Sequence, residues 1–343
     1  MAMHSFPLAR YRLEFQATSP IRLPDYAGSM LRGAFGHALR QLACMRRQKE
    51  CADCPLLTSC PYPAIFAPPP PATHALQKFS QIPVPYVIEP PAWGARQLGE
   101  GDSLVFHFVL IGRALKELPL VILAWRRAFA RGVGTGDGTA ELVRVDHSSE
   151  AGVNGDTEIH RPDTGALIPH AQEIRLHPDR EADTTRISLE FTTPLRLQRN
   201  GHALPPEKLD ARTLLMALAR RANLLAEFHA HGPLIDDFSA LTKACDGIRD
   251  ARQLVWRDWT RYSSRQHQAM ALGGVVGTWT LEGELAPFAP FLHLGKWLHV
   301  GKEAAFGLGA YATANPPGEH ISGDQAKNRE SLVQPVEGEI KIA

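Results

Sequence analysis

The stretch Leu13–Leu23 reads LEFQATSPIRL, and a closely similar stretch, LEFTTPLRL, returns at Leu189–Leu197. In both copies apolar and polar residues alternate, as in a β-strand with one buried face, and a turn containing proline follows. Each copy leads into an amphipathic pattern, over residues 26–47 and 207–229, that predicts a long helix. A repeated strand–turn–helix opening indicates two domains built on one plan.

The remaining pattern of each half follows the same order. The first half predicts an extended segment at 84–89, a strand at 104–110, a helix at 118–131 and a strand at 141–146. The second half predicts strands at 253–261 and 274–281, a helix at 287–298 and a strand at 306–313. Both halves therefore read βαββαβ, which is the split βαβ or ferredoxin-like plan.

The predicted fold class is α+β, with two tandem ferredoxin-like (RRM-like) domains. We expect the first domain over residues 1–146, with a cysteine-rich insertion at 44–60, and the second over 186–313, with a glycine-rich loop. The polar, glycine-rich segment 147–185 predicts an interdomain loop or hairpin, and residues 314–343 predict a flexible tail.

Composition excludes several classes of protein. The 343 residues hold 44% hydrophobic and 21% charged side chains, which is ordinary for a globular chain and excludes wholesale disorder. There is no run of about 18 apolar residues, so we expect no membrane span. The opening residues do not read as a secretory signal, and a cytoplasmic protein is expected.

The net charge of +1 conceals a segregation of charge along the chain. Residues 1–50 carry eight basic and three acidic side chains, a local charge of +5, and residues 243–265 carry six and three, a local charge of +3. Residues 146–190 carry four basic and ten acidic side chains, a local charge of −6. The two basic segments could form one positive face, or they could be chance clusters on a solvated surface.

Four of the five cysteines follow the pattern C-x6-C-x2-C-x5-C, at Cys44, Cys51, Cys54 and Cys60. Four thiolates satisfy the tetrahedral preference of zinc, and a C-x2-C pair supplies two of them from one turn. A structural zinc site is therefore predicted here, with no open position for catalysis. The alternatives are free thiols, or disulfides in an oxidising compartment.

The first predicted helix holds a histidine off its apolar face. That face gathers Leu31, Ala34, Phe35, Ala38, Leu42 and Met45. His37 lies about 120° from the centre of this stripe, beside Gly33, Arg40 and Arg47. The glycines at 33 and 36 are poor helix formers, which suggests that a bulky group approaches closely there. A histidine among arginines suits general acid–base chemistry on a phosphodiester, and the alternative is an idle surface histidine.

Two further segments have the composition of phosphate- or nucleic-acid-binding surfaces. Residues 299–311, HVGKEAAFGLGAY, place three glycines near Lys296 and Lys302, and a glycine-rich backbone can bring amide groups to a phosphate. This loop has neither the Walker spacing nor a dinucleotide fingerprint. Residues 256–266, WRDWTRYSSRQ, interleave arginines with aromatics, as in RNA-binding strands, although an ordinary half-buried strand would read the same way.

Together these stretches resemble the repeat-cleaving endoribonucleases of CRISPR systems, members of the RAMP superfamily. The likeness rests on LPDYAGSMLRGAFGHALR at 23–40, the cysteine cluster ending at Tyr62, RYSSRQ at 261–266 and GKEAAFGLG at 301–309. It implies a protein that binds the repeat of a CRISPR precursor transcript and cuts it once, without a metal ion, leaving a 2′,3′-cyclic phosphate.

The resemblance also implies roles for particular residues. In such enzymes the catalytic histidine commonly lies on the first helix, which here indicates His37, and Lys302 is the second catalytic candidate. The predicted RNA-binding residues are Arg32, Arg40, Arg47, Arg257, Arg261, Arg265, Lys296, His299, Gly301, Gly307 and Gly309. The expected partners are repeat RNA, as precursor and as mature guide, other CRISPR effector subunits and a second copy of the chain.

Two other functions fit the same sequence. One is a non-catalytic subunit that stays on the guide RNA as a scaffold, since some relatives bind RNA without cutting it. The other is a zinc-stabilised interaction protein that binds no RNA. The three functions predict different results with repeat RNA. The endoribonuclease cuts it, the scaffold binds it without cutting, and the interaction protein binds it weakly with an affinity that hardly depends on salt.

Overall fold

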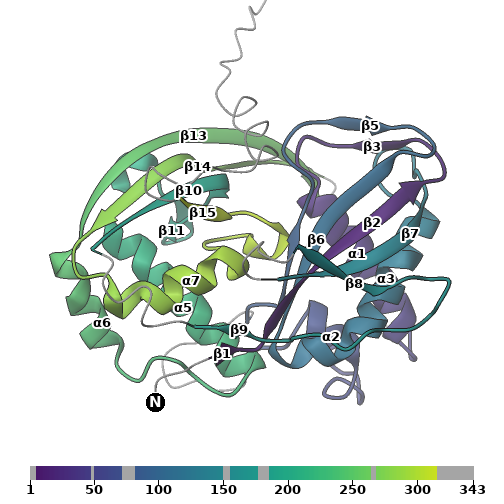
Figure 1. Ribbon diagram of the computed structural model, residues 1–343, viewed down its shortest axis with the longest axis horizontal. Helices are drawn as coiled ribbons and strands as arrows, with labels where there is room; N and C mark the ends of the chain where they lie inside the picture. The colour runs from purple at the N-terminus through teal and green to yellow at the C-terminus, as the bar shows by residue number, and fades with distance from the viewer. Residues whose placement is uncertain are drawn as a thin grey trace, which may run out of the picture. The chain divides into compact units, whose positions relative to one another are not determined.

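The computed structural model describes residues 5–47, 50–71, 82–149, 155–176, 185–263 and 268–314, and the described residues up to 313 belong to one compact unit (Figure 1). Side chains are described throughout these ranges except at 259–272 and 314. The predicted tail, apart from Ala314, lies outside the described residues. Among the described residues, no helix has both the length and the hydropathy of a membrane span.

The N-terminal half is a five-stranded sheet with two helices on one face. Its strand order is β4-β6-β2-β7-β8, from β2 (Leu8–Ala17), β4 (Tyr86–Glu89), β6 (Ser103–Ile111), β7 (Ala140–Ser148) and β8 (Asp156–His160). Helix α1 (Gly28–Ala43) follows β2, and α3 (Leu118–Arg131) follows β6. In βαββαβ numbering the first four of these strands lie in the order 2-3-1-4, which is 4-1-3-2 read from the other side, and β8 is added beside the fourth strand, so the predicted ferredoxin-like plan is present.

The C-terminal half repeats the plan. Its sheet order is β13-β14-β10-β15, from β10 (Arg186–Leu195), β13 (Arg249–Ser263), β14 (Gln268–Glu282) and β15 (Tyr311–Ala314). Helices α5 (Ala211–His229) and α7 (Ala289–Leu298) complete the βαββαβ order. Strands β13 and β14 form one long antiparallel hairpin, paired from Arg249↔Glu282 to Ser263↔Gln268. The fold class is therefore α+β, with two tandem ferredoxin-like units.

Short elements join and extend the two sheets. They are β1 (Ser5–Phe6), β3 (Ile21–Leu23), α2 (Pro61–Phe66), β5 (Arg96–Leu98), β9 (Ile174–Arg175), β11 (Gln198–Arg199), β12 (His202–Ala203) and α6 (Phe238–Ala244). Among the described residues, 3₁₀ turns lie at 112–117, 206–208, 245–247, 286–288 and 304–306. Within the segment 147–185, β8 pairs with β7 as a hairpin and β9 pairs with β1.

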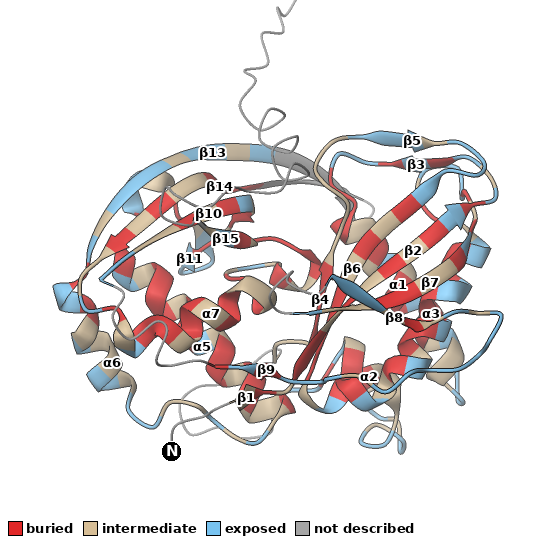
Figure 2. Ribbon diagram, viewed as in Figure 1, coloured by how far each residue is buried: buried red, intermediate tan, exposed pale blue. Residues whose placement is uncertain are grey.

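Apolar and polar residues alternate along β2, so one face of the first sheet is buried against the helices and the other is not. Tyr11, Leu13 and Phe15 are buried toward the helices, whereas Arg12 and Glu14 lie on the opposite face. Figure 2 shows buried and intermediate residues alternating along β2. The buried side chains form two main clusters, one under α1 and α3 and one around α5 and α7. The second cluster also includes Val87 and Val109 of the first sheet, so the two halves share part of their core.

Several predicted boundaries were wrong, including the start of the second long helix, which is Ala211 and not residue 207, and two of them lie close to predicted site residues. The first helix ends at Ala43 and not at residue 47, because Cys44 is extended (φ −83°, ψ 97°), and Met45, predicted on the apolar face, is 85% exposed. The last strand begins at Tyr311 and not at 306, because a 3₁₀ turn and the positive φ of Gly307 and Gly309 break the extended backbone.

Candidate functional site

A surface pocket of about 620 Å³ lies where the C-terminal ends of α1 and α3 meet. Its lining residues are His37, Arg40, Gln41, Cys44, Arg47, Arg127 and Arg131. The pocket therefore joins three of the predicted site residues, His37, Arg40 and Arg47, to two arginines of α3 that the sequence did not single out.

Packing of the two helices against the sheet creates this pocket. Phe35 of α1 stacks on Trp125 of α3, with ring centroids 5.0 Å apart, and both rings are fully buried. Two residues beyond each of these rings, His37 and Arg127 are exposed and line the pocket. Because residues i and i+4 share a helix face, His37 lies beside Gln41, and Arg127 lies beside Arg131.

The charge of the pocket is entirely positive. Four arginines line it, and no aspartate or glutamate is among the lining residues. Within the described ranges, Arg47, Arg127 and Arg131 form no ion pair with a carboxylate. Guanidinium groups gathered in this way favour an anion, and their planar forks suit phosphate oxygens in particular.

His37 is exposed at the pocket, as its position off the apolar stripe predicted. Its Nε2 atom accepts a hydrogen bond from Gln41 Nε2 at 2.7 Å. An imidazole nitrogen that accepts a hydrogen bond carries its lone pair, and the proton of the neutral ring then resides on Nδ1. His37 is thus oriented with a basic nitrogen toward the side of the helix that bears the arginines.

The two glycines next to His37 have different surroundings. A Cβ atom on Gly36 would lie 2.1 Å from Cζ of Phe66, so the bulky group that approaches there is the protein's own α2. A Cβ atom on Gly33 would meet nothing within 4 Å. The helix face of Gly33 and His37 is consequently open, whereas the face of Gly36 is covered.

The aromatic side chains of α2 hold two predicted RNA-binding residues. The Arg32 guanidinium lies over the Phe66 ring, 4.7 Å from its centroid, and the Arg40 guanidinium lies 5.6 Å from the centroid of Tyr62. Arg32 does not line the pocket, whereas Arg40 contacts Tyr62 and lines the pocket as well. Cation–π contact orients both guanidinium groups before any ligand binds.

The glycine-rich loop packs against the first half of the molecule, at the start of α1. Tyr26 Oη donates a hydrogen bond to the carbonyl oxygen of Phe306 at 2.8 Å. Gly307 (φ +100°) lies so close to Tyr26 and Ile88 that a Cβ atom there would be 2.6 Å from Tyr26 Oη and 2.7 Å from the Ile88 carbonyl oxygen. Intramolecular packing alone therefore requires this glycine.

The other predicted residues of this loop lie outside the His37 pocket. His299, predicted to bind RNA, is only 2% exposed, and its Nε2 atom lies 3.5 Å from Glu89 Oε1. Burial raises the pKa of Glu89, but Arg10 and His299 outweigh that effect and hold it well below the usual range. As placed, His299 joins the loop to β4 and has no surface for RNA.

Lys302 and Lys296 are likewise separate from His37. The backbone N–H of Lys302 donates to the Arg196 carbonyl oxygen at 2.8 Å, and its side chain is exposed. The Lys296 ammonium lies 5.6 Å from the Trp297 ring centroid. Neither lysine lines the pocket, so the two predicted catalytic residues, His37 and Lys302, are not brought together there.

Strand β13 carries the predicted arginine–aromatic patch. The Arg257 guanidinium lies 5.0 Å from the Trp93 ring centroid, and Trp93 in turn contacts Tyr26 with centroids 4.9 Å apart. Arg257 is thereby placed near the glycine-rich loop. The Arg261 side chain and all of Arg265 lie outside the described residues.

The cysteine cluster does not fit the predicted zinc site. In the part of the chain that the structure describes, no group of three or more His, Cys, Asp or Glu side chains could hold a metal ion. Cys60 Sγ instead donates to the Ala43 carbonyl oxygen at 3.9 Å, and burial raises the pKa of the Cys51 thiol, with the neighbouring cysteines adding to the rise. The thiols lie near one another without the convergence that tetrahedral coordination needs.

Comparison with protein families gives two matches. A model of the family CRISPR-associated endoribonuclease Cas6 matches residues 189–311, and a model described as an N-terminal domain matches residues 6–172. No curated protein sequence matches the chain.

Solved structures share the fold along most of the chain. A Cas6 product complex has a TM-score of 0.54 at 16% identity and covers 90% of this chain and 100% of its own. Thermus thermophilus Cas6 has a TM-score of 0.50 at 14% identity, covering 91% and 100%. A partial Cas6-RT-Cas1–Cas2 complex has a TM-score of 0.54 at 13% identity and covers 92% of this chain and 47% of its own. At these identities the likeness establishes the fold.

Proposed function

Because residues 189–311 match the family of CRISPR-associated endoribonucleases Cas6, we propose that this chain processes CRISPR precursor RNA and cuts the repeat in the His37 pocket by a metal-independent reaction. The observation that carries the proposal is the pocket itself. It places a histidine with a basic nitrogen among four arginines and no carboxylate. This combination suits a phosphodiester whose negative charge increases during reaction.

The proposed reaction uses the RNA's own 2′-hydroxyl as the nucleophile. His37 Nε2 takes the proton of that hydroxyl, the 2′-oxygen bonds to phosphorus, and the bond from phosphorus to the 5′-oxygen breaks. The leaving 5′-oxygen takes a proton from water. The products are a 2′,3′-cyclic phosphate and a free 5′-hydroxyl, so every bond and proton is accounted for without a metal ion.

The arginines act on the charge of the transition state. Arg40 reaches the pocket from the same helix as His37, and Arg47 lies just beyond the end of that helix. Guanidinium groups aimed at the phosphorane oxygens stabilise the developing charge more than the charge of the ground state, which is the requirement for catalysis. Gln41 orients the His37 ring through the hydrogen bond at 2.7 Å until the substrate replaces it.

The test is cleavage of 5′-labelled CRISPR repeat RNA in EDTA by the wild type and by His37→Ala. We expect the variant to lose cleavage by at least about 1000-fold while RNA affinity stays within a few-fold, because His37 is exposed and no core contact is lost. His202→Ala, which removes another exposed histidine on β12, is the matched control and should cut normally. Undiminished cutting by His37→Ala would overturn the assignment.

The same assay addresses the alternatives to the proposed reaction. RNA bound tightly with no product from the wild type would favour the scaffold function, and a 3′ end other than a cyclic phosphate would exclude the proposed chemistry. A catalytic contribution of Lys302 stays a prediction, as do association with other CRISPR subunits and formation of a homodimer.

A further inference from the structure

We propose that Arg127 and Arg131 of α3 bind the RNA backbone phosphates next to the scissile bond, so that the RNA strand crosses the pocket from α1 to α3. The proposal rests on the proposed function, because it takes the His37 pocket as the cleavage site. It adds a second helix to the RNA-binding surface and assigns two residues that neither the sequence reasoning nor the family match identifies.

The first argument is position. Arg127 and Arg131 are one helical turn apart on the same face of α3, and both line the pocket that contains His37. Side chains at i and i+4 have Cβ atoms about 6 Å apart, so two guanidinium groups spaced in this way can reach two separate phosphates of one strand. The pocket volume of about 620 Å³ is of the size that holds a small-molecule ligand and is larger than one phosphate needs.

The second argument is charge. Arg127 and Arg131 have no ion pair with a carboxylate in the described part of the chain, and they share their pocket with Arg40 and Arg47. Like charges that converge repel one another, so this arrangement contributes nothing favourable to the fold in the absence of an anion. An anionic ligand removes the repulsion and gains charge-assisted hydrogen bonds.

A purely structural explanation accounts for less of the geometry. A cation in the last turn of a helix interacts favourably with the helix dipole, and Arg131 occupies the last turn of α3. That effect falls off within one turn and does not explain Arg127. Neither does it require that both side chains line a pocket that also contains the histidine of another helix.

Arg126 provides a matched control within the same helix. It is exposed and adjacent in sequence to Arg127, but it does not line the pocket. Substitution of Arg126 removes the same charge from the same helix, so any effect of net charge or helix propensity is common to both variants. Only a phosphate contact made in the pocket distinguishes them.

The experiment measures affinity for repeat RNA against salt concentration. The RNA carries a 2′-deoxynucleotide at the cleavage position, which removes the nucleophile and separates binding from cutting. For Arg127→Ala/Arg131→Ala we expect an affinity loss of about 10- to 100-fold and a slope of log K against log [salt] that is shallower by about 1.4, the value for two lost contacts to a single strand. Arg126→Ala should leave the slope within about 0.3 of wild type.

A slope unchanged by Arg127→Ala/Arg131→Ala would overturn the proposal, as would an equal change in Arg126→Ala. Thermal unfolding of all variants shows whether an affinity loss reflects unfolding. A shallower slope combined with normal cutting by His37→Ala would retain the phosphate site and reject the catalytic assignment. An unchanged slope for Arg127→Ala/Arg131→Ala, combined with loss of cutting by His37→Ala, would reject the phosphate site and retain the catalytic assignment.

Discussion

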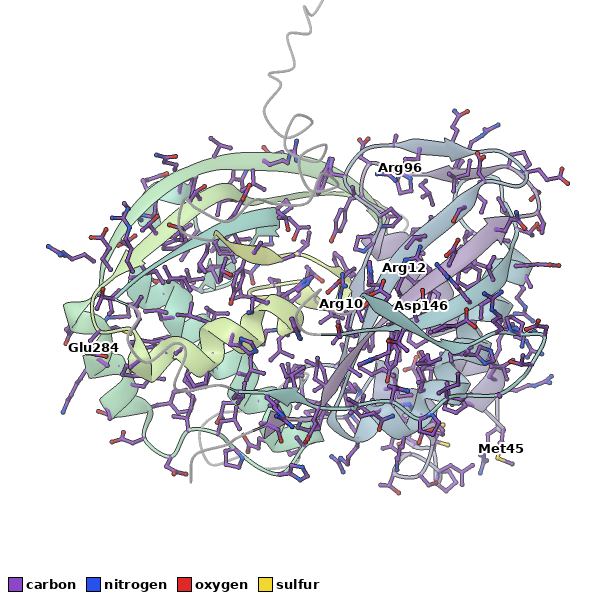
Figure 3. The ribbon with its side chains drawn as sticks, in the orientation of Figure 1. Arg10, Arg12, Met45, Arg96, Asp146 and Glu284 are labelled. Atoms are coloured by element: carbon purple, nitrogen blue, oxygen red, sulfur yellow. The ribbon has the colours of Figure 1, made fainter. Side chains whose placement is uncertain are left out.

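Two groups of arginines in the N-terminal half differ in their partners. On the open face of the sheet, Arg10 lies 2.7 Å from Glu89, Arg12 lies 3.0 Å from Asp146, and Arg144 lies 3.0 Å from Glu14. Figure 3 shows Arg10, Arg12 and Asp146 together over this sheet. A hydrogen bond from Arg12 holds the pKa of Glu14 below its usual value, although burial opposes the shift.

On the helix side of the same sheet, the pocket arginines have the opposite environment. Arg47, Arg127 and Arg131 have no carboxylate partner among the described residues. Many RNA-binding domains of ferredoxin-like topology stack bases on aromatic residues of the open sheet face. Here that face is closed by ion pairs, and the arginines without a carboxylate partner among the described residues lie on α3 and just beyond the end of α1. The local charge of +5 over residues 1–50 therefore overstates the binding surface, because Arg10 and Arg12 are already paired.

The largest effect should follow from reversing charge on the helix side. We expect Arg127→Glu/Arg131→Glu to weaken binding of repeat RNA by about 1000-fold, roughly 4 kcal/mol, because two attractive contacts become repulsive ones. The measurement is fluorescence anisotropy with labelled RNA at fixed salt. Arg144→Ala, which removes a paired arginine of the sheet face, should change affinity less than about threefold. Equal losses in the two variants would eliminate the distinction between the faces.

The second largest effect concerns stability and lies on the sheet face. Asp146 is only 2% exposed. Its Oδ2 atom accepts a hydrogen bond from Arg12 and lies 3.4 Å from Arg144 Nε. We expect Asp146→Ala to lower the free energy of unfolding by about 3 kcal/mol, since it removes the buried carboxylate of this cluster and leaves Arg12 and Arg144 to share Glu14. Urea denaturation measures this loss. Arg131→Ala in the helix pocket should cost less than about 0.5 kcal/mol, and a similar loss in both would contradict the comparison.

Much of this fold could be predicted from the sequence, because local periodicity determines most of it. The helix at 118–131 has the predicted bounds, since its apolar residues recur with the helical period and Gly132 follows its last turn. The first helix was predicted too long because Met45 continues the apolar period beyond Cys44. The apolar period of a sequence does not show whether another element covers a given side chain. No such cover exists for Met45 among the described residues, and this side chain is exposed.

The site could be predicted only in part, for the same reason. The angle of His37 around its helix follows from the sequence, and the structure places it on an open surface as expected. The contribution of Arg127 depends on α3 packing beside α1, and the pairing of Arg12 depends on Asp146, 134 residues away along the chain. A sequence pattern shows which residues are charged, whereas only tertiary contacts show which charges are neutralised.

A third prediction uses pH to test whether the ion-paired face of the first sheet is closed to protons. Burial lowers the pKa of His107 to about 4, with Arg10 adding to the shift and Glu89 opposing it. The unfolded chain, with an ordinary histidine pKa of about 6.5, then binds more protons between these two values, so stability is fully present above pH 6.5 and falls as pH decreases toward 4. From pH 7.5 to pH 5 the expected loss from His107 is about 2 kcal/mol.

The control for this prediction is His107→Gln, followed by denaturant unfolding at each pH. The variant should lose less stability on acidification than wild type, and the remaining slope should come from His147 and His229, whose pKa values burial also lowers. Identical pH slopes for wild type and variant would show that His107 is accessible to protons, and hence that the sheet face is not closed.

The last prediction distinguishes the open and covered faces of α1 itself, where each substitution adds a single methyl group. Gly33→Ala places a methyl group in empty space, so we expect a gain of up to about 1 kcal/mol from helix propensity. Gly36→Ala places the same methyl group against the Phe66 ring, and overpacking of this kind costs about 1–3 kcal/mol. Thermal unfolding of the two variants compares one substitution at two positions in one helix, so propensity cancels and only the surroundings differ. Similar shifts would mean that α2 does not cover this face, and Arg32 and Arg40 would then lose the aromatic contacts that orient them beside the pocket.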